Sequence, residues 1–333
     1  MKRFVISLVL IVLMAGLVVT SCGATGKFVS IGTRTPGSTS YAVYVPVAAV
    51  LNKYMDMKVA VEPTGGFGQV YHYLKTGELQ FCADSIDQTA SGYFNKWFWD
   101  KGRLTWLRIA LSHYFSGYFY GVRATSDIRS FKDLEGKKLM TYSVTGPAQG
   151  FLMDHMLEKY GVTPAAKLKF SRFASSVQQL VEGKVDVISY SASASAWIDA
   201  DRAPDGLRVI FPNREEIDYI NKKLGAKLWS IRPLPPGYLG LKALEKGGYE
   251  FGAAGVLTTS SAVPDDVVYQ VVKIMFEHQA EYKDAYPKCA EITLENALEG
   301  FVVPIHPGAI KYYKEKGIWT AEHEAFQEQV LKK

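Results

Sequence analysis

The stretch Val29–Tyr41, VSIGTRTPGSTSY, decides the fold, and it runs directly into AVYVPVAAVLNKY at residues 42–54. A β-branched run, a turn of Gly, Pro and hydroxyl residues, and then helical spacing predict a strand, a turn and a helix start. The first amides of a helix have no intrahelical acceptor and carry a partial positive charge, so this junction favours an anion. An ordinary helix-capping loop is the alternative. Candidate donors in the turn are Thr33, Arg34, Thr35, Ser38, Thr39 and Ser40.

The same unit recurs twice in the first hundred residues. Lys58–Glu62 alternates like a strand and leads into PTGGFG at residues 63–68, and the short run Leu79–Ala83 leads into DSIDQ at residues 84–88. Three strand–turn–helix units in succession predict an α/β fold with a parallel sheet. Ligands of such sheets bind beyond the carboxyl ends of the strands, where all three turns lie.

Two long apolar segments divide the chain into two α/β domains. Residues 104–124 are expected to leave the first domain as strands, and Glu250–Thr258 to return to it. Between them, the turn at residues 141–148 and the run SASAS at 191–195 again follow predicted strands. We therefore assign residues 22–124 and 250–333 to domain I and residues 125–249 to domain II, joined by crossing strands that suit closure about a hinge. Ser191, at a strand end of domain II, is a candidate ligand contact. Helices at Leu294–Leu298 and Pro307–Glu315 are expected to finish the chain.

The N-terminus has the pattern of an export signal. A charged start, the apolar run Phe4–Val19 and small residues before Cys22 resemble a bacterial lipobox, which implies a signal peptide at residues 1–21 and lipidation of Cys22. A plain secretory signal with an incidental cysteine is the alternative. No second stretch approaches the roughly 20 apolar residues of a membrane span. A periplasmic, membrane-anchored lipoprotein is expected.

Charge and cysteine content exclude some classes of protein. The net charge is +5 over 333 residues, and removal of Lys2 and Arg3 would leave 36 basic against 33 acidic residues, or +3. No basic run is interleaved with aromatic residues, so a nucleic-acid partner has little support. Cys82 and Cys289 carry no disulfide signature, and separate buried thiols are favoured over a bond between them.

The usual signatures of catalysis are missing. No serine lies in a Gly-x-Ser-x-Gly turn, and His323-Glu324 is followed by Gln327 where a zinc-binding HExxH needs a second His. Gly136-Lys137 lacks the remainder of a phosphate-binding loop. Hydroxyl and amide donors at strand ends bind an anion without activating it, so a receptor without cofactor or metal is favoured. The alternative is a secreted enzyme that uses Asp84 or Asp87 with a tyrosine.

Five segments together resemble the TAXI family, the extracytoplasmic solute-binding proteins of tripartite ATP-independent periplasmic (TRAP) transporters. The resemblance runs from about residue 29 to about residue 318, and its strongest part is the C-terminal segment. The segments are IGTRTPGSTSYAVYVPVAAVL (31–51), VEPTGGFGQVYHYLKTGELQF (61–81), DIRSFKDLEGKKLM (127–140), GKVDV (183–187) and ENALEGFVVPIHPGAIKYYKEKGI (295–318).

The resemblance implies a type II periplasmic-binding-protein fold, with a small carboxylate enclosed between the domains and delivered to a TRAP membrane permease. The ligand would be a glutamate-like amino acid or a 2-oxo or dicarboxylic acid. An importer driven by ATP hydrolysis (ABC) shares the fold and stays a second possibility. The implied pocket residues are Thr33, Ser38, Thr39, Tyr41, Thr64, Gly65, Gly66, Ser85, Asp87, Thr145 and Gly146.

The first and third loops depart from the family pattern. The usual Gly-Thr-Gly becomes Gly32-Thr33-Arg34, the usual Gly-Gly becomes Gly37-Ser38, and Gln-Ser-Asp becomes Ser85-Ile86-Asp87. An added arginine and a lost glutamine alter the ligand preference that the family pattern implies. Arg34 is therefore a candidate ligand contact, with solvent exposure as the alternative.

Overall fold

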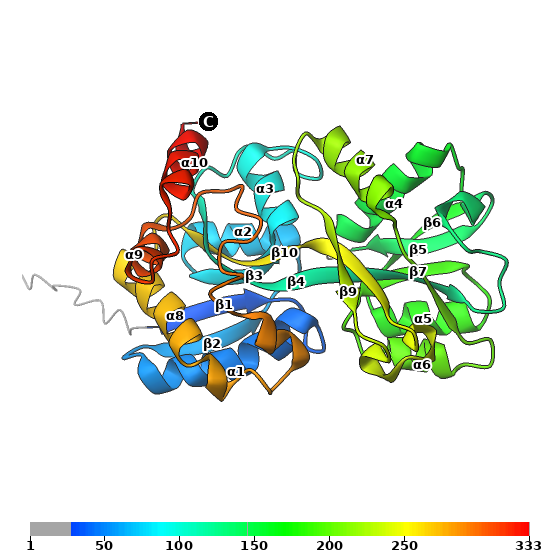
Figure 1. Cartoon of the computed structure of the whole chain (residues 1–333), viewed down its shortest axis with the longest axis horizontal. Helices are drawn as coiled ribbons and strands as arrows, with labels where there is room; N and C mark the ends of the chain where they lie inside the picture. The colour runs from blue at the N-terminus through cyan, green and yellow to red at the C-terminus, as the bar shows by residue number, and fades with distance from the viewer. Residues whose placement is uncertain (1–27, 145, 333) are drawn as a thin grey trace, which may run out of the picture.

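The computed structural model describes residues 28–144 and 146–332. The predicted signal peptide, the lipidation site Cys22 and the predicted ligand contact Thr145 lie outside these residues. Figure 1 shows two lobes side by side, joined by the long strands β4 and β10. The predicted α/β architecture of two lobes linked by crossing strands is confirmed, while the residue boundaries of the two domains stay a prediction.

The first lobe contains the N-terminal strands and the helices at both ends of the chain (Figure 1). Its strands are β1 (Phe28–Thr33), β2 (Lys58–Pro63) and β3 (Phe81–Ser85). Its helices are α1 (Thr39–Tyr54), α2 (Phe67–Thr76), α3 (Ile86–Phe94), α8 (Asp265–Glu277), α9 (Pro307–Glu315) and α10 (Ala321–Leu331), with 3₁₀ turns at Gln279–Glu281 and Pro287–Glu291. Strand β1 pairs in parallel with β2 and with β3, as the three strand–turn–helix units predict.

The second lobe repeats this plan. Its strands are β5 (Lys138–Ser143), β6 (Ala166–Phe170), β7 (Val187–Ser191), β8 (Leu207–Ile210) and β9 (Ser230–Leu234). Its helices are α4 (Ala148–Tyr160), α5 (Phe173–Val181), α6 (Trp197–Arg202) and α7 (Arg214–Leu224), with 3₁₀ turns at Phe131–Leu134, Tyr238–Gly240 and Lys242–Leu244. Strand β5 lies between β6 and β7 and is parallel to both.

Strands β4 (Leu107–Arg123) and β10 (Gly248–Ser260) unite the lobes into one sheet, in the order β2-β1-β3-β10-β4-β7-β5-β6. The apolar segment predicted at residues 104–124 is one continuous strand, and the predicted return strand is confirmed. Glycines let the two strands cross closely: a Cβ atom at Gly252 would lie 2.0 Å from the carbonyl oxygen of Ser116. No side chain fits into that space.

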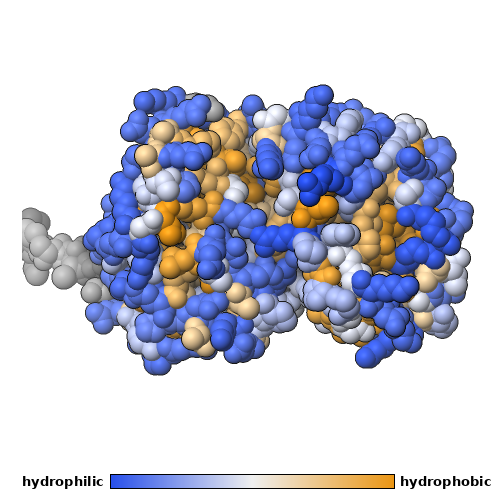
Figure 2. All heavy atoms as spheres, in the orientation of Figure 1, coloured by the Kyte–Doolittle hydropathy of each residue, from blue (hydrophilic) through white to orange (hydrophobic). Residues whose placement is uncertain are grey.

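Each lobe is built around buried apolar side chains. Helix α1 shows the pattern: Val43, Val47, Val50 and Leu51 recur at helical spacing, and all four are buried against the sheet. A second cluster in the other lobe surrounds Trp197. In Figure 2, hydrophilic residues cover most of the visible outer surface and apolar areas are seen within both lobes.

One predicted element is wrong. Residues 294–298 form turns instead of a helix, because five residues cannot offset the cost of helix nucleation without a strong start signal. The predicted helix at Pro307–Glu315 is confirmed as α9. Cys82 and Cys289 are both buried and free, which confirms the prediction of separate thiols.

Candidate functional site

A cavity between the lobes is the candidate functional site. It has a volume of about 100 Å³. Since a buried water needs roughly 10–15 Å³ of volume measured in this way, the cavity has room for several waters or for one small ligand. Its lining comes from the β1–α1 turn, the β3–α3 junction, β4, the β5–α4 turn and the end of β7. The lining residues are Arg34, Ser38, Thr39, Ser40, Ala83, Asp84, Ser85, Gln88, Tyr114, Ser116, Tyr118, Ser143, Gly146, Ala148, Gln149, Tyr190 and Ser191.

Three helices begin at this cavity, and two of them belong to the first lobe. Ser38 caps α1, its hydroxyl accepting from the amide of Tyr41 at 3.3 Å, and Ser85 occupies the equivalent position before α3. Helix α4 of the second lobe begins at Ala148, beside Gly146 and Gln149. Because helix N-termini present free amide donors and a partial positive charge, their convergence favours an anionic ligand.

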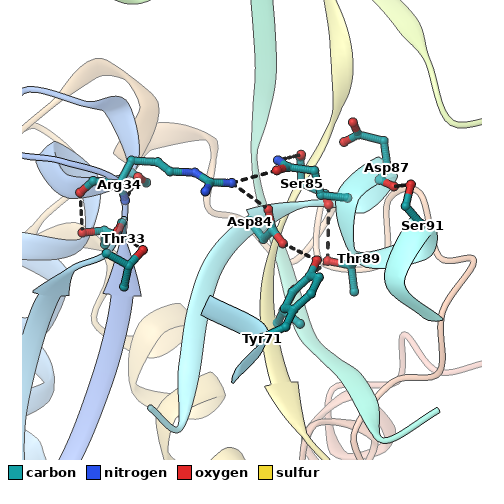
Figure 3. A network of polar contacts seen from close by, with 12 residues as sticks. Thr33, Arg34, Tyr71, Asp84, Ser85, Asp87, Thr89 and Ser91 are labelled. Carbon is teal, nitrogen blue, oxygen red and sulfur yellow. Dashed lines mark hydrogen bonds and ion pairs between the residues drawn. The ribbon is translucent and has the colours of Figure 1, made fainter. Parts of the chain in front are cut away.

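Arg34 is the cation among the described residues that line the cavity, and its side chain crosses from the end of β1 towards β3 (Figure 3). Its Nη2 donates to Oε1 of Gln88 at 2.8 Å and lies 3.5 Å from Oδ1 of Asp84. The Gln88 amide in turn donates to the Ser85 hydroxyl at 2.8 Å. One end of the guanidinium is thus held by α3, and a fifth of its side chain stays exposed.

Asp84 is the partner that positions Arg34. Its side chain is 2% exposed, and its second oxygen accepts a hydrogen bond from the Tyr71 hydroxyl at 2.6 Å. Burial raises the pKa of Asp84, while Arg34 and Tyr71 stabilise the carboxylate and oppose that rise. Burial is the largest influence on the pKa of Arg34 and lowers it, but the attraction of Asp84, with smaller contributions from Cys82, Tyr71 and Tyr118, raises the pKa on balance. The pair is therefore an ion pair whose carboxylate is buried and also accepts a hydrogen bond from Tyr71.

Asp87 lies in the first turn of α3, on the far side of Ser85 from Arg34 (Figure 3). It is 1% exposed, and within residues 28–144 and 146–332 neither carboxyl oxygen has a hydrogen-bond partner. Burial raises the pKa of Asp87 to about 7, an effect that Ser85 reduces and the charge of Asp84 increases. Such a carboxyl holds its proton into the neutral range.

The two lobes contact each other at the edge of the cavity. The Thr39 hydroxyl, in the first turn of α1, lies 3.1 Å from the hydroxyl of Ser191 and 2.6 Å from that of Ser193. Tyr286 also reaches across, donating to the carbonyl of Ser193 at 3.1 Å. These bonds hold the described conformation closed around the cavity.

The structure brings part of the predicted set together. The predicted residues that line the cavity are Arg34, Ser38, Thr39, Ser85, Gly146 and Ser191. Thr33 and Thr64 lie outside it and support the turn, the Thr64 hydroxyl donating to the carbonyl of Thr33 at 2.9 Å. Gly65 and Gly66 line a neighbouring cavity that also touches Gly146. Tyr41 and Asp87 are not among the lining residues, and Thr145 lies outside the described part of the chain.

Several residues that line the cavity were not predicted from the sequence. Ser143, Ala148 and Gln149 lie in or just after the predicted turn at residues 141–148, and Gln88 ends the DSIDQ segment. The residues missed on β4 are Tyr114, Ser116 and Tyr118. Their spacing of two places them on one face of the strand, but β4 is buried on both faces over most of its length, so its apolar pattern does not reveal which face meets a ligand.

Two other features of the described residues bear on the site. None of the helices between residues 28 and 332 is long and apolar enough to cross a membrane. In the same part of the chain, no three His, Cys, Asp or Glu side chains are placed to hold a metal ion together.

Several solved structures share this fold. PhnD1 from Prochlorococcus marinus in complex with methylphosphonate is 10% identical, with a TM-score of 0.55 over 88% of this chain and 99% of that one. A structure described as a periplasmic transporter is 12% identical, with a TM-score of 0.51 over 92% and 97%. XAC2383 from Xanthomonas citri bound to chloride ion is 11% identical, with a TM-score of 0.51 over 91% and 100%. At such identities the likeness shows the fold alone.

The sequence itself matches one family over most of its length. The NMT1-like family matches residues 31–317, which include both crossing strands, every residue that lines the cavity and both lobes except α10 and the start of β1. The chain therefore belongs to the NMT1-like family and has the fold of periplasmic solute-binding proteins.

Proposed function

We propose that this protein is an extracytoplasmic receptor that captures a small carboxylate between its lobes and delivers it to a membrane transporter. The observation that carries the proposal is the cavity of about 100 Å³, at which three helix N-termini from both lobes meet beside Arg34. Binding between lobes that close about β4 and β10 converts ligand capture into a change of shape, which a membrane partner can recognise.

The chemistry of the lining suits recognition of an oxyanion. Charge-assisted hydrogen bonds from amides, hydroxyls and a guanidinium to a carboxylate contribute about 1.5–3 kcal/mol each. Ser38 and Ser85 belong to the first lobe, and Ser143 and Ser191 to the second, so one ligand contacts both. Tyr114, Tyr118 and Tyr190 supply ring surface for the apolar part of a small acid.

The enzyme alternative gains little from this arrangement. Tyr71 is a donor to Asp84, and burial raises its pKa well above the ordinary value, so the phenol does not ionise readily to act as a base or nucleophile. Turnover of a bound compound that the substitution Asp87→Asn abolishes would nevertheless favour an enzyme over a receptor.

The transporter is proposed to be of the TRAP type, because the chain resembles the TAXI family from about residue 29 to about residue 318. An ABC importer is the competing partner. Uptake in vesicles that contain the candidate permease decides between them: dependence on an ion gradient supports TRAP, and dependence on ATP supports ABC. Export, cleavage before Cys22 and lipid attachment there are proposed from the N-terminal sequence, and the intact mass of the mature protein tests them.

Binding itself is tested with a library of organic acids and amino acids by thermal shift. A ligand at 100 times its dissociation constant stabilises the folded state by about 2.7 kcal/mol. We expect stabilisation by at least one small carboxylate, with weaker binding in Arg34→Gln. Native mass spectrometry of freshly purified protein gives an independent measure through a co-purified acid. Absence of any shift across the library, together with ligand-free native spectra, would refute the proposal.

A further inference from the structure

The described lining of the cavity is electrically balanced. Its charged side chains are Arg34 and Asp84, whose closest atoms are 3.5 Å apart, and the other lining residues carry hydroxyl, amide, phenol or apolar groups. The positive charge that would otherwise attract an acid is therefore already compensated by the protein. A ligand entering the cavity meets hydrogen-bond donors in abundance but no net charge from these side chains.

The carboxylate of Asp84 is held in place beside the cavity. Its side chain is 2% exposed at the end of β3, with Arg34 at one oxygen and the Tyr71 hydroxyl 2.6 Å from the other. Figure 3 shows both partners converging on this carboxyl group from opposite sides. A second carboxyl, that of the buried Asp87, lies three residues further along and adds no positive charge.

This balance sets a limit on the ligand. One carboxylate can be held by the helix N-termini and by Arg34, whereas a second carboxylate in the same cavity would be removed from water without a counter-charge. Electrostatic repulsion between such groups is much larger in a partly buried site than in water. The unfavourable free energy of binding therefore depends on the second negative charge of a ligand and not on the ligand's size.

We propose that Asp84 is a specificity determinant that restricts the cavity to small acids of net charge zero or −1 and rejects dianionic dicarboxylates. The inference rests on the proposed function, since it concerns the same cavity. It narrows the ligand class from small carboxylates in general to monocarboxylates and to amino acids whose ammonium group offsets a charge.

The experiment compares diacids with their monoamides, which have nearly the same shape but one negative charge fewer. Succinate is paired with succinamate, glutarate with glutaramate, and 2-oxoglutarate with 2-oxoglutaramate. Dissociation constants are measured by calorimetry at pH 7.5, where both carboxyl groups of the diacids are ionised. In the wild-type protein we expect the monoamide of the best-fitting pair to bind at least tenfold more tightly than the diacid.

The test quantity is the ratio of the dissociation constant of the diacid to that of its monoamide. The substitution Asp84→Asn keeps the shape of the side chain and removes its charge, so it should reduce this ratio at least tenfold. Asp127→Asn is the matched control, because it makes the same change of net charge at a side chain that is 79% exposed and does not line the cavity; its ratio should equal that of the wild type. Circular dichroism verifies that each variant folds. The wild-type comparison needs no substitution, so it decides the inference even where Asp84→Asn does not fold.

Each outcome has a distinct meaning. A wild-type diacid that binds as tightly as its monoamide, or more tightly, overturns this inference and leaves the receptor proposal standing. A ratio that a folded Asp84→Asn variant does not change overturns the assignment to Asp84. Failure of every acid in the larger library to bind refutes the proposed function, and this inference with it.

Discussion

Replacement of Asp87 by Asn should change how the stability of this protein depends on pH. The Asp87 carboxyl is 1% exposed in the first turn of α3, and its oxygens have no hydrogen-bond partner among the residues that the structure describes. Burial raises its pKa from 3.8 to about 7 in the folded protein. Asparagine has the same shape and cannot ionise, so it imitates the protonated carboxyl at every pH.

The sign follows from counting protons. Above about pH 4 the carboxyl is ionised in the unfolded chain, but it stays protonated in the folded protein until about pH 7. The folded state therefore binds more protons in this window, so the free energy of unfolding decreases as the pH rises from about 4 to about 7 and then levels off. Between pH 5 and pH 8 the loss spans roughly two pKa units at 1.36 kcal/mol each, or about 2.7 kcal/mol.

The assay is urea unfolding followed by circular dichroism at pH 5 and pH 8 for the wild type and Asp87→Asn. We expect the variant to gain about 2.7 kcal/mol relative to the wild type between the two pH values, and to be the more stable protein at pH 8. Asp127→Asn is the control: Lys137 holds the pKa of Asp127 below its ordinary value, so its effect on stability should be the same at pH 5 and at pH 8. Parallel pH profiles for the wild type and Asp87→Asn would refute the reasoning.

Three further substitutions test the closure and the crossing strands. Thr39→Val removes the hydrogen bond to Ser193 at 2.6 Å and should favour the open form. We expect a larger radius of gyration in X-ray scattering and a several-fold weaker affinity for the ligand. Equal radii of gyration for the variant and the wild type would contradict this prediction. Gly252→Ala forces a Cβ atom to within 2.0 Å of a carbonyl oxygen of β4. The free energy of unfolding, measured in urea, should therefore fall by more than about 2 kcal/mol. A loss below about 1 kcal/mol would show that the two strands can move apart. Lys288→Met leaves the carboxylate of Glu250 buried without its partner at 2.7 Å and should cost about 3–5 kcal/mol by the same measurement, with near-neutrality as the contrary result.

Local sequence predicted the elements that local physics governs. The turn at Gly32–Ser40 has its hydroxyls and glycine placed before an apolar helical stripe, and it folds as a strand, a turn and a capped helix. The segment at residues 104–124 is too long and too apolar for one domain, and it becomes β4, which runs through both lobes. Residues 294–298 show the limit of such reasoning, since a short run of helix-forming residues folds as turns.

The candidate site was predictable only in part. Turns at the carboxyl ends of strands predict donors such as Ser38, Ser85 and Gly146, because the parallel sheet places these turns at the same edge. The tyrosines of β4 give no such signal, because a strand buried on both faces has the same apolar pattern whichever face a ligand meets. The role of Arg34 was open in the sequence, and its direction depends on Asp84, which is 50 residues away.

The sequence by itself determined the class of fold, the two crossing strands, and the abundance of donors at strand ends, because these depend on the spacing of apolar, glycine and hydroxyl residues along the chain. Only the tertiary structure decided the charges in the cavity and beside it. A carboxylate at Asp84 compensates Arg34, and a buried carboxyl at Asp87 keeps its proton, because β3 and α3 bring these groups out of water and next to one another. Such pairings arise from distances in space, which spacing along the sequence does not contain.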